Sequence, residues 1–242
     1  MDAIRKDEMP DATHSLYVDQ WDWERVIFKE EKSLMFLKKI VRHIYHCIYK
    51  TKKYINKKYP SLKHTLRKEV FFIHSQDLQD LYPYLSPKER EDKICKEHEV
   101  VFIIGIGHKL EDGKEHDIRA TDYDDWSTKV KIKNKTYYGL NGDLLVYDHV
   151  SKRALELSSM GIRVCKDSLL FQLKEKKETY KLKFDYHKRI IQERLPLTIG
   201  GGIGQSRLCM FLLEKAHIGE VQSSVWPEEV YKDAKRRGVS LL

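Results

Sequence analysis

Apolar residues recur at intervals of three and four positions along residues 28–58, which is the spacing of one face of an α-helix. These apolar positions are Leu34, Leu37, Val41, Ile44 and Ile48. Because charged and polar residues separate them, the pattern predicts a long helix with one buried side. We expect that side to pack on a sheet.

Short apolar runs predict the strands of this sheet at residues 70–74, 100–107, 139–150 and 154–164. The run at 100–107 is apolar almost throughout, which is typical of a central strand buried on both faces. The last two segments are expected to be adjacent and antiparallel. Between them and the central strand, Glu111–Lys114 predicts a hairpin turn that leads to a strand ending near Arg119.

Capping signals predict further helices at residues 75–82, 87–98, 166–173 and 179–194. Ser86 and Pro87, for example, place a cap before a proline in the first helical turn. Pro196 then introduces a glycine-rich strand. This order of elements predicts an α+β fold, in which helices flank an antiparallel sheet. With 242 residues, of which 41% are hydrophobic, we expect one domain over residues 1–242.

The glycine-rich strand is the strongest functional signal. It contains Gly200, Gly201, Gly202 and Gly204, and it leads into an apolar helix that has Arg207 in its first turn. Glycines let backbone approach a flat or charged ligand, and a guanidinium can stack on a purine and bind phosphate. A nucleotide site is the functional interpretation. A close strand-to-helix crossing with a solvated arginine is the structural alternative.

Two common nucleotide motifs do not fit this segment. A P-loop needs Gly-Lys followed by Ser or Thr, and no such triplet follows the glycines. A dinucleotide fingerprint opens a βαβ unit, yet fewer than forty residues follow Arg207. The pattern therefore favours a glycine strand near the end of a domain.

Two carboxylates lie within apolar strand sequences. Asp143 lies in the first of the two adjacent strands and Glu156 in the second. Charges flanked by apolar residues are costly unless something compensates them. If the strands are neighbours, both acids can converge on a Mg²⁺ ion carried by ATP, since this ion takes one or two protein carboxylates plus phosphate oxygens. Alternatively, both acids point outward from the wet face of the sheet.

Two further polar clusters are candidates for ligand binding. Residues 119–126 begin with Arg119 and contain three aspartates in four positions, which create a local negative field. Residues 14–24 place Gln20, Asp22 and Glu24 on one strand face. Arg5 stands one strand upstream of that segment.

Charge, cysteine spacing and the lengths of apolar runs limit the kinds of partner and the location that we expect for this protein. The formal net charge of +8 gathers in lysine-rich blocks at residues 50–58, 129–135 and 174–188, which are typical of solvated faces; nucleic-acid contact is the less favoured interpretation. The four cysteines are widely spaced, so neither a zinc site nor a disulfide framework is indicated. No apolar run is long enough for a membrane span, and the charged start does not suit a signal peptide. We expect a cytoplasmic protein.

Six strings carry a resemblance to a known family: HSLYVDQWDWERV, RATDYDDWST, GLNGDLLVY, ELSSMGIRV, TIGGGIGQSRL and HIGEVQSSVWP. Together they resemble ammonia-dependent asparagine synthetase, or aspartate-ammonia ligase, whose catalytic domain is similar to class II aminoacyl-tRNA synthetases. The resemblance extends from Met1 through nearly the whole chain. It implies that ATP and L-aspartate form β-aspartyl-AMP and pyrophosphate, after which ammonia displaces AMP to give L-asparagine.

The resemblance also implies roles for individual residues. Arg5 falls where the fold keeps the second-motif arginine, on the α-phosphate. ATP contacts are implied for Arg119, Arg163, Gly200, Gly201, Gly202, Gly204 and Arg207. Asp143 and Glu156 are implied as metal or ribose-side carboxylates. Gln20, Asp22 and Ser159 resemble residues that face the substrate aspartate, with Asp22 counted among the catalytic groups, and Asp124 is the candidate to bind ammonium or take its proton.

Members of the family have a further N-terminal portion before the second motif, carrying the first motif and much of the dimer interface. From its absence here we expect an unpaired sheet edge and a pocket short of part of one wall. A homodimer is implied for the complete form. Two alternatives remain: a class II synthetase-like protein that binds ATP and tRNA, and an inactive fragment that binds adenylate.

Overall fold

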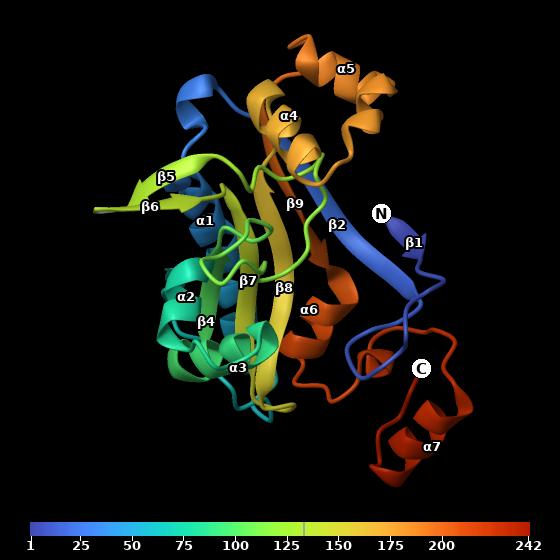
Figure 1. Ribbon diagram of the computed structural model, residues 1–242. Helices are drawn as coiled ribbons and strands as arrows, with labels where there is room; N and C mark the ends of the chain where they lie inside the picture. The colour runs from blue at the N-terminus through green and yellow to red at the C-terminus, as the bar shows by residue number, and fades with distance from the viewer. Residues whose placement is uncertain (133) are drawn as a thin grey trace.

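A seven-stranded sheet forms the centre of the molecule in the computed structural model, which describes residues 1–132 and 134–242 (Figure 1). Neighbouring strands are antiparallel except for the pair β3 and β4. The strands, in spatial order, are β1 (Asp2–Ile4), β2 (Tyr17–Val26), β9 (Thr198–Gly204), β8 (Arg153–Ile162), β7 (Asn141–Asp148), β4 (Val100–Ile104) and β3 (Phe71–His74). A separate ribbon pairs β5 (Lys129–Ile132) with β6 (Lys135–Tyr138).

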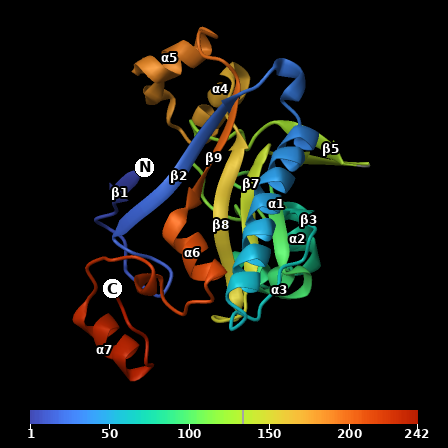
Figure 2. The same cartoon turned by 180° about the vertical axis from the view of Figure 1, so that it is seen from behind.

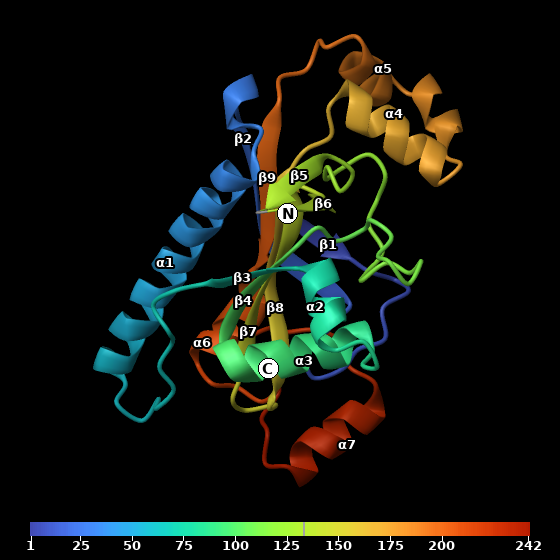
Figure 3. The same cartoon turned by 60° about the vertical axis from the view of Figure 1, so that its left-hand side comes forward.

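Helices cover both faces of this sheet, as the views from behind and from the side show (Figures 2 and 3). One face is covered by α1 (Leu34–Lys58) and α6 (Gln205–Leu212). The other is covered by α2 (Ser75–Leu81) and α3 (Pro87–His98), with α4 (Lys166–Glu175) above them in Figure 1. The remaining helices are η1 (Lys29–Glu31), η2 (Thr179–Lys183), α5 (Asp185–Ile191), η3 (Ile218–Glu220) and α7 (Glu228–Arg236).

The side chains of β4 point alternately to the two faces of the sheet, and each face has its own apolar core. Val100, Phe102 and Ile104 belong to the apolar cluster that α1 and α6 complete. Val101 and Ile103 belong to a second cluster, with Leu78 of α2 and Ile94 of α3. Because successive strand residues point to opposite faces, an all-apolar strand can serve both cores. The predicted α+β architecture is therefore confirmed.

Helix starts follow their caps. The first long helix begins at Leu34 rather than near residue 28, because the side chain of Ser33 accepts the Phe36 N–H at 3.2 Å. Ahead of it, Glu31 accepts the Phe28 N–H at 3.0 Å within the short turn η1. The start of α3 at Pro87, after a cap at Ser86, is as predicted.

Three local predictions were wrong. The turn at residues 111–114 exists, but the strand predicted up to Arg119 is reduced to one bridge between Lys109 and Glu115. The helix predicted at 179–194 is split into η2 and α5, because Phe184 has extended backbone. No strand was predicted in the lysine-rich stretch 129–135, yet it contributes to β5 and β6; its residue Lys133 lies outside the described residues.

The glycines of β9 have different neighbours because the strand is paired on both sides. A Cβ on Gly201 would lie 2.6 Å from Cβ of Met160 and 2.7 Å from the backbone oxygen of Ser159. Met160 is wholly buried in the core under α1. At Gly204 the nearest atom would be Cβ of Arg207, at an ordinary 3.5 Å. Only the first of these two positions requires a glycine for packing.

We therefore expect Gly201→Ala to lower the free energy of unfolding by about 1–3 kcal/mol, because the added methyl group overpacks the contact between β9 and β8. Gly204→Ala is the matched control and should change stability by less than about 0.5 kcal/mol. Urea denaturation followed by circular dichroism measures both. Equal effects of the two substitutions would contradict this packing.

Candidate functional site

Two adjoining cavities lie on the α3 side of the sheet. The first has a volume of about 230 Å³ and the second about 340 Å³. Gln20 of β2, Ser159 of β8 and Gly202 of β9 line both cavities. Three neighbouring strands, β2, β9 and β8, therefore supply a common floor, as expected for a ligand that extends from one cavity into the other.

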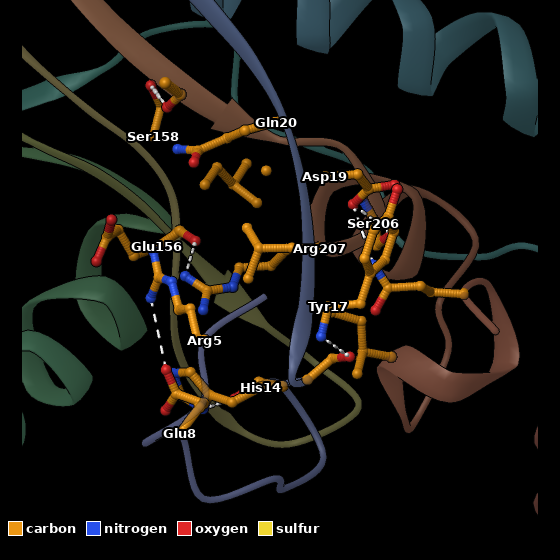
Figure 4. A pocket seen from close by; sticks show the side chains of 18 of the residues that line it. Arg5, Glu8, His14, Tyr17, Asp19, Gln20, Glu156, Ser158, Ser206 and Arg207 are labelled. Atoms are coloured by element: carbon orange, nitrogen blue, oxygen red, sulfur yellow. Dashed lines mark hydrogen bonds and ion pairs between the residues drawn. The ribbon is translucent and has the colours of Figure 1, made fainter. Parts of the chain in front are cut away.

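Two arginines converge in the first cavity (Figure 4). Arg207, in the first turn of α6, donates from Nη1 to the backbone oxygen of Glu156 at 3.1 Å. Arg5 follows β1 and lies 3.5 Å from the carboxylate of Glu8, with half of its side chain exposed. In Figure 4 both guanidinium groups point into the same space. This arrangement favours an anionic ligand.

The two acids predicted to converge do so. Asp143 lies opposite Ser159, and a bulge at Leu144/Leu145 then pairs Leu145 with Glu156. The bulge matters because residues 156 and 159 of a regular strand point to opposite faces. With it, Glu156 and Ser159 line the same cavity. The alternative in which both acids face bulk solvent is excluded, since Asp143 is only 4% exposed.

The pKa of each of these two acids is raised above its ordinary value. The charge of Asp143, followed by burial, raises the pKa of Glu156 from 4.5 to about 7. Burial likewise raises the pKa of Asp143, although Arg119 beside it acts in the opposite direction. Two carboxylates this close in a partly dry hollow are unfavourable without a cation.

A divalent cation fits this pair. Oδ1 of Asp143 is buried and has no hydrogen-bond partner among the described residues, while its Oδ2 is bound by Arg119. A hard ion such as Mg²⁺ prefers carboxylate oxygens and takes its other ligands from phosphate and water. No group of three or more metal-ligating side chains occurs in residues 1–132 and 134–242, so the protein alone supplies few ligands.

Asp124 is the buried acid of the second cavity, where Asp22, Arg119 and Tyr123 also lie. Burial raises the pKa of Asp124 from 3.8 to about 6, against the opposing influence of Arg163, with which it forms an ion pair. Asp22 is more exposed, at 42% of its side chain. The second cavity therefore presents two carboxylates, of which Asp124 pairs with Arg163 and Asp22 lies 3.9 Å from the N-terminal amine.

Arg163 differs from the ATP contact that the resemblance implies. Its guanidinium lies 3.0 Å from Glu24, 3.0 Å from the Tyr123 hydroxyl and 3.8 Å from the centre of the Tyr123 ring. It also holds Asp124, and it is not among the described residues that line either cavity. In this structure Arg163 orients an acid of the site rather than reaching into the cavities.

The expectation of bare backbone at all four glycines was wrong. A Cβ at Gly200 would lie 2.0 Å from Glu24 and 2.6 Å from Arg163, so side chains already cover this position. At Gly202 it would lie 2.2 Å from Nε2 of Gln20. Gly201 faces the core. Only Gly202 and Gly204 line the first cavity.

Sequence reasoning missed Asp19 and Tyr123. Oδ1 of Asp19 accepts from the Ser206 hydroxyl at 2.7 Å, from the Ser206 N–H at 3.3 Å and from Gln222 at 3.2 Å, which fixes the start of α6 and hence Arg207. The alternating pattern of the strand gives no sign of this long-range contact of Asp19. Nothing in the sequence identified Tyr123 as the ring under Arg163.

Comparisons with known proteins agree with these observations. A family model described as aspartate-ammonia ligase matches residues 1–238. The aspartate–ammonia ligase of Parabacteroides distasonis is 55% identical over 247 residues, and that of Bacteroides thetaiotaomicron 53% over 242. Both matches cover 100% of this chain and 69% of the relative.

Solved structures share the fold at low identity. Asparaginyl-tRNA synthetase from Pyrococcus horikoshii, complexed with asparaginyl-adenylate, matches with a TM-score of 0.65 and 14% identity, over 94% of this chain and 52% of that one. The Entamoeba histolytica asparaginyl-tRNA synthetase complex with asparaginyl-adenylate matches with a TM-score of 0.62 and 18% identity, over 92% and 50%. The sheet is thus similar to class II synthetase catalytic domains.

Among the described residues, none of the helices combines the length and the apolar character that a membrane span requires.

The raised pKa of Glu156 leads to a prediction about the stability of the fold. A carboxyl group whose folded pKa is raised costs stability once it ionises, so Glu156 should destabilise the metal-free chain increasingly from pH 4.5 up to about 7 and fully above it. Glu156→Gln should therefore raise the free energy of unfolding by about 1–3 kcal/mol at pH 8, with a gain near zero at pH 4. Chemical denaturation at both pH values, in chelator, measures this. A loss of stability at pH 8 would show that Glu156 is stabilised by its surroundings.

Proposed function

Because the chain belongs to the aspartate-ammonia ligase family, we propose that its two adjoining cavities hold ATP and L-aspartate side by side for the ligation of ammonia to aspartate. The first cavity, with Arg5 and Arg207, takes the nucleotide. The second, with Asp22 and Asp124, takes the amino acid and the ammonia. The shared floor of Gln20, Ser159 and Gly202 supports this placement, because the reacting atoms must meet between the two ligands.

In the first step, a β-carboxylate oxygen of aspartate attacks the α-phosphorus of ATP. A new O–P bond forms and the bond to the leaving pyrophosphate breaks, which gives β-aspartyl-AMP. Negative charge develops on the phosphoryl oxygens, and Arg5 and Arg207 neutralise it. A magnesium ion brought by the phosphates would be held by Asp143 and Glu156 and supplies further positive charge there.

In the second step, the nitrogen of ammonia attacks the β-carbonyl carbon and AMP leaves. Ammonium is not nucleophilic, so a proton must be removed first. With a pKa of about 6, Asp124 is ionised at neutral pH and can hold ammonium and accept its proton. Arg163, held by Glu24 and Tyr123, keeps this carboxylate oriented toward the cavity.

Gln20, Asp22 and Ser159 form the proposed pocket for the amino-acid substrate. The side chains of Gln20 and Asp22 lie over Gly202, where a Cβ would displace them. Their amide and carboxylate, with the Ser159 hydroxyl, offer partners for the α-amino group of aspartate. Arg119, bound to Asp143 and to Asp117 at 2.6 Å, lines the second cavity and is the candidate for a phosphate or carboxylate contact.

We further infer a homodimer that acts in the cytoplasm. Large apolar side chains on β2 and after it are exposed, with Trp21 at 52%, Val26 at 61% and Phe28 at 75%. A second copy of the chain can cover such a surface. The observation that carries the functional proposal is nevertheless the site itself: Arg5, Arg207 and Glu156 line one cavity, and the buried Asp143 lies behind Glu156.

Arg207 tests the nucleotide half. We expect Arg207→Ala to weaken Mg²⁺–ATP binding by about 10–100-fold, since charge-assisted hydrogen bonds to phosphate are lost. Aspartate affinity should change less than threefold. Isothermal titration calorimetry measures both, and Arg189→Ala, on the exposed side of α5, is the control. Unchanged ATP affinity would refute the assignment of the first cavity.

Asp124 tests the ammonia half. Asp124→Asn should leave aspartate-dependent ATP–pyrophosphate exchange within about threefold and slow asparagine formation from the adenylate by about 10²–10⁴-fold. Thermal unfolding checks that the lost ion pair with Arg163 has not unfolded the chain. The assignment is wrong if both half-reactions fall together in a folded variant, or if the ammonia step is untouched.

A further inference from the structure

The long helix α1 and the segment that follows it carry the excess positive charge of the chain. Residues 32–68 contain twelve lysines and arginines and no aspartate or glutamate. Because the whole chain has 45 basic and 37 acidic residues, the remainder of the molecule is net negative. The net charge of +8 is therefore concentrated in one region rather than spread over the surface.

Five of these cations are exposed and follow the outer side of α1: Lys39, Arg42, Lys50, Lys53 and Lys57. At 3.6 residues per turn they fall within a sector of about 80° around the helix, over a length of about 27 Å. The opposite side of the helix is buried in the core. Figure 3 shows α1 along one flank of the molecule, outside the sheet. These five residues form a basic stripe that faces solvent along its length.

The fold does not neutralise the basic stripe. In the part of the chain that the structure describes, its cations make no ion pair, although Arg42 lies 4.8 Å from the centre of the Phe72 ring. By contrast, the buried Lys52 of the same helix pairs with Glu214 at 2.8 Å and donates to the backbone oxygen of Leu212 at 2.9 Å. Like charges three or four positions apart destabilise a helix. The stripe is therefore a row of repelling charges that an anionic partner would relieve.

The length of the stripe favours a repeating anion. At 1.5 Å per residue, its neighbouring cations are about 4.5 to 12 Å apart along the helix axis, so a single phosphate meets only one or two of them. Duplex nucleic acid carries about one negative charge per 1.7 Å of its axis. Its backbone therefore offers phosphates to the whole stripe.

Two other anionic partners fit this helix less well. A helix that lies in a membrane surface buries its apolar face in the lipid, whereas the apolar face of α1 is used by the core. A single-stranded nucleic acid is usually bound in a groove whose aromatic side chains stack on the bases. The basic stripe instead lies on the convex outer side of a helix.

We propose that the basic stripe of α1 binds the phosphate backbone of duplex nucleic acid without reading its base sequence. Lysine and arginine contacts to phosphate supply affinity that does not depend on the bases. The two cavities lie on the α3 side of the sheet, whereas α1 covers the other face and lies in front of it in Figure 2. The inference is therefore independent of the proposed ligase function.

The test is fluorescence anisotropy of the full chain with labelled duplexes of about 20 base pairs, one of RNA and one of DNA, at about 50–200 mM salt. Five phosphate contacts predict that the logarithm of the association constant falls against the logarithm of the salt concentration with a slope of about −4 to −5. Replacing three lysines together, by Lys50→Gln, Lys53→Gln and Lys57→Gln, should weaken binding about tenfold or more and reduce the slope by about 3. The tighter of the two duplexes identifies the source of the backbone.

The matched control removes the same charge elsewhere, by Lys93→Gln, Lys109→Gln and Lys232→Gln. These lysines are exposed and pair with Glu97, Glu175 and Glu228. The control should change duplex affinity less than about threefold, because it leaves the stripe intact. Since the stripe variant loses like-charge repulsion, it should unfold at a temperature no lower than that of the unsubstituted chain.

Four results would overturn the proposal. The unsubstituted chain could fail to bind either duplex at about 50 mM salt, or bind a single strand as tightly as a duplex. Equal losses in the two triple variants would mean that only net charge matters. Binding to vesicles of phosphatidylserine and phosphatidylcholine, without binding to the duplexes, would make the partner a membrane. None of these measurements uses ATP or aspartate, so failure of the ligase proposal would be seen separately.

Discussion

The site depends on an unfavourable contact: two carboxylates brought together on one sheet face. Asp143 is buried and Glu156 half-buried; the charge of Asp143 raises the pKa of Glu156, and burial raises that of Asp143. The fold enforces the contact through the bulge between β7 and β8, which turns Glu156 to the same face as Asp143. Under the proposed function, a metal carried by the nucleotide would relieve this contact, and its energetic cost would then contribute to metal binding.

The arginines can be understood from the same constraint. Arg119 forms an ion pair with Asp143 and so offsets its buried charge. Arg163 does the same for Asp124 and is itself held by Glu24 and Tyr123. Arg5 and Arg207 are held less tightly: Arg5 lies 3.5 Å from Glu8, and Arg207, whose charge lowers the pKa of Glu156, donates to a backbone oxygen at 3.1 Å. Both line the first cavity.

Periodicity and caps made much of the fold predictable. The strand at 100–107, the helix after Ser86 and the pairing of β7 with β8 could be read from local patterns, because apolar spacing and capping act over a few residues. Local patterns could not predict that the strand expected before Arg119 is absent. Arg119 and Asp117 make contacts there that depend on the folded sheet. The break at Phe184 likewise has no signal in the residue pattern.

For the site, motifs identified the residues but not their partners. Asp143, Glu156 and Arg207 were predicted and lie together. The roles of Gly200 and Arg163 were not predictable, because only the register of β2 against β9 brings Glu24 over Gly200 and under the guanidinium. Sequence patterns indicate which residue types a site contains, whereas strand register decides which of them face the ligand.

The most direct test supplies the chain with ATP, Mg²⁺ and L-aspartate, without and then with ammonium, and measures AMP and asparagine in the same samples. We expect aspartate-dependent adenylate formation without ammonium, followed by equal amounts of AMP and asparagine once ammonium is added. Cleavage of ATP to ADP, or AMP release that does not depend on aspartate, would contradict it.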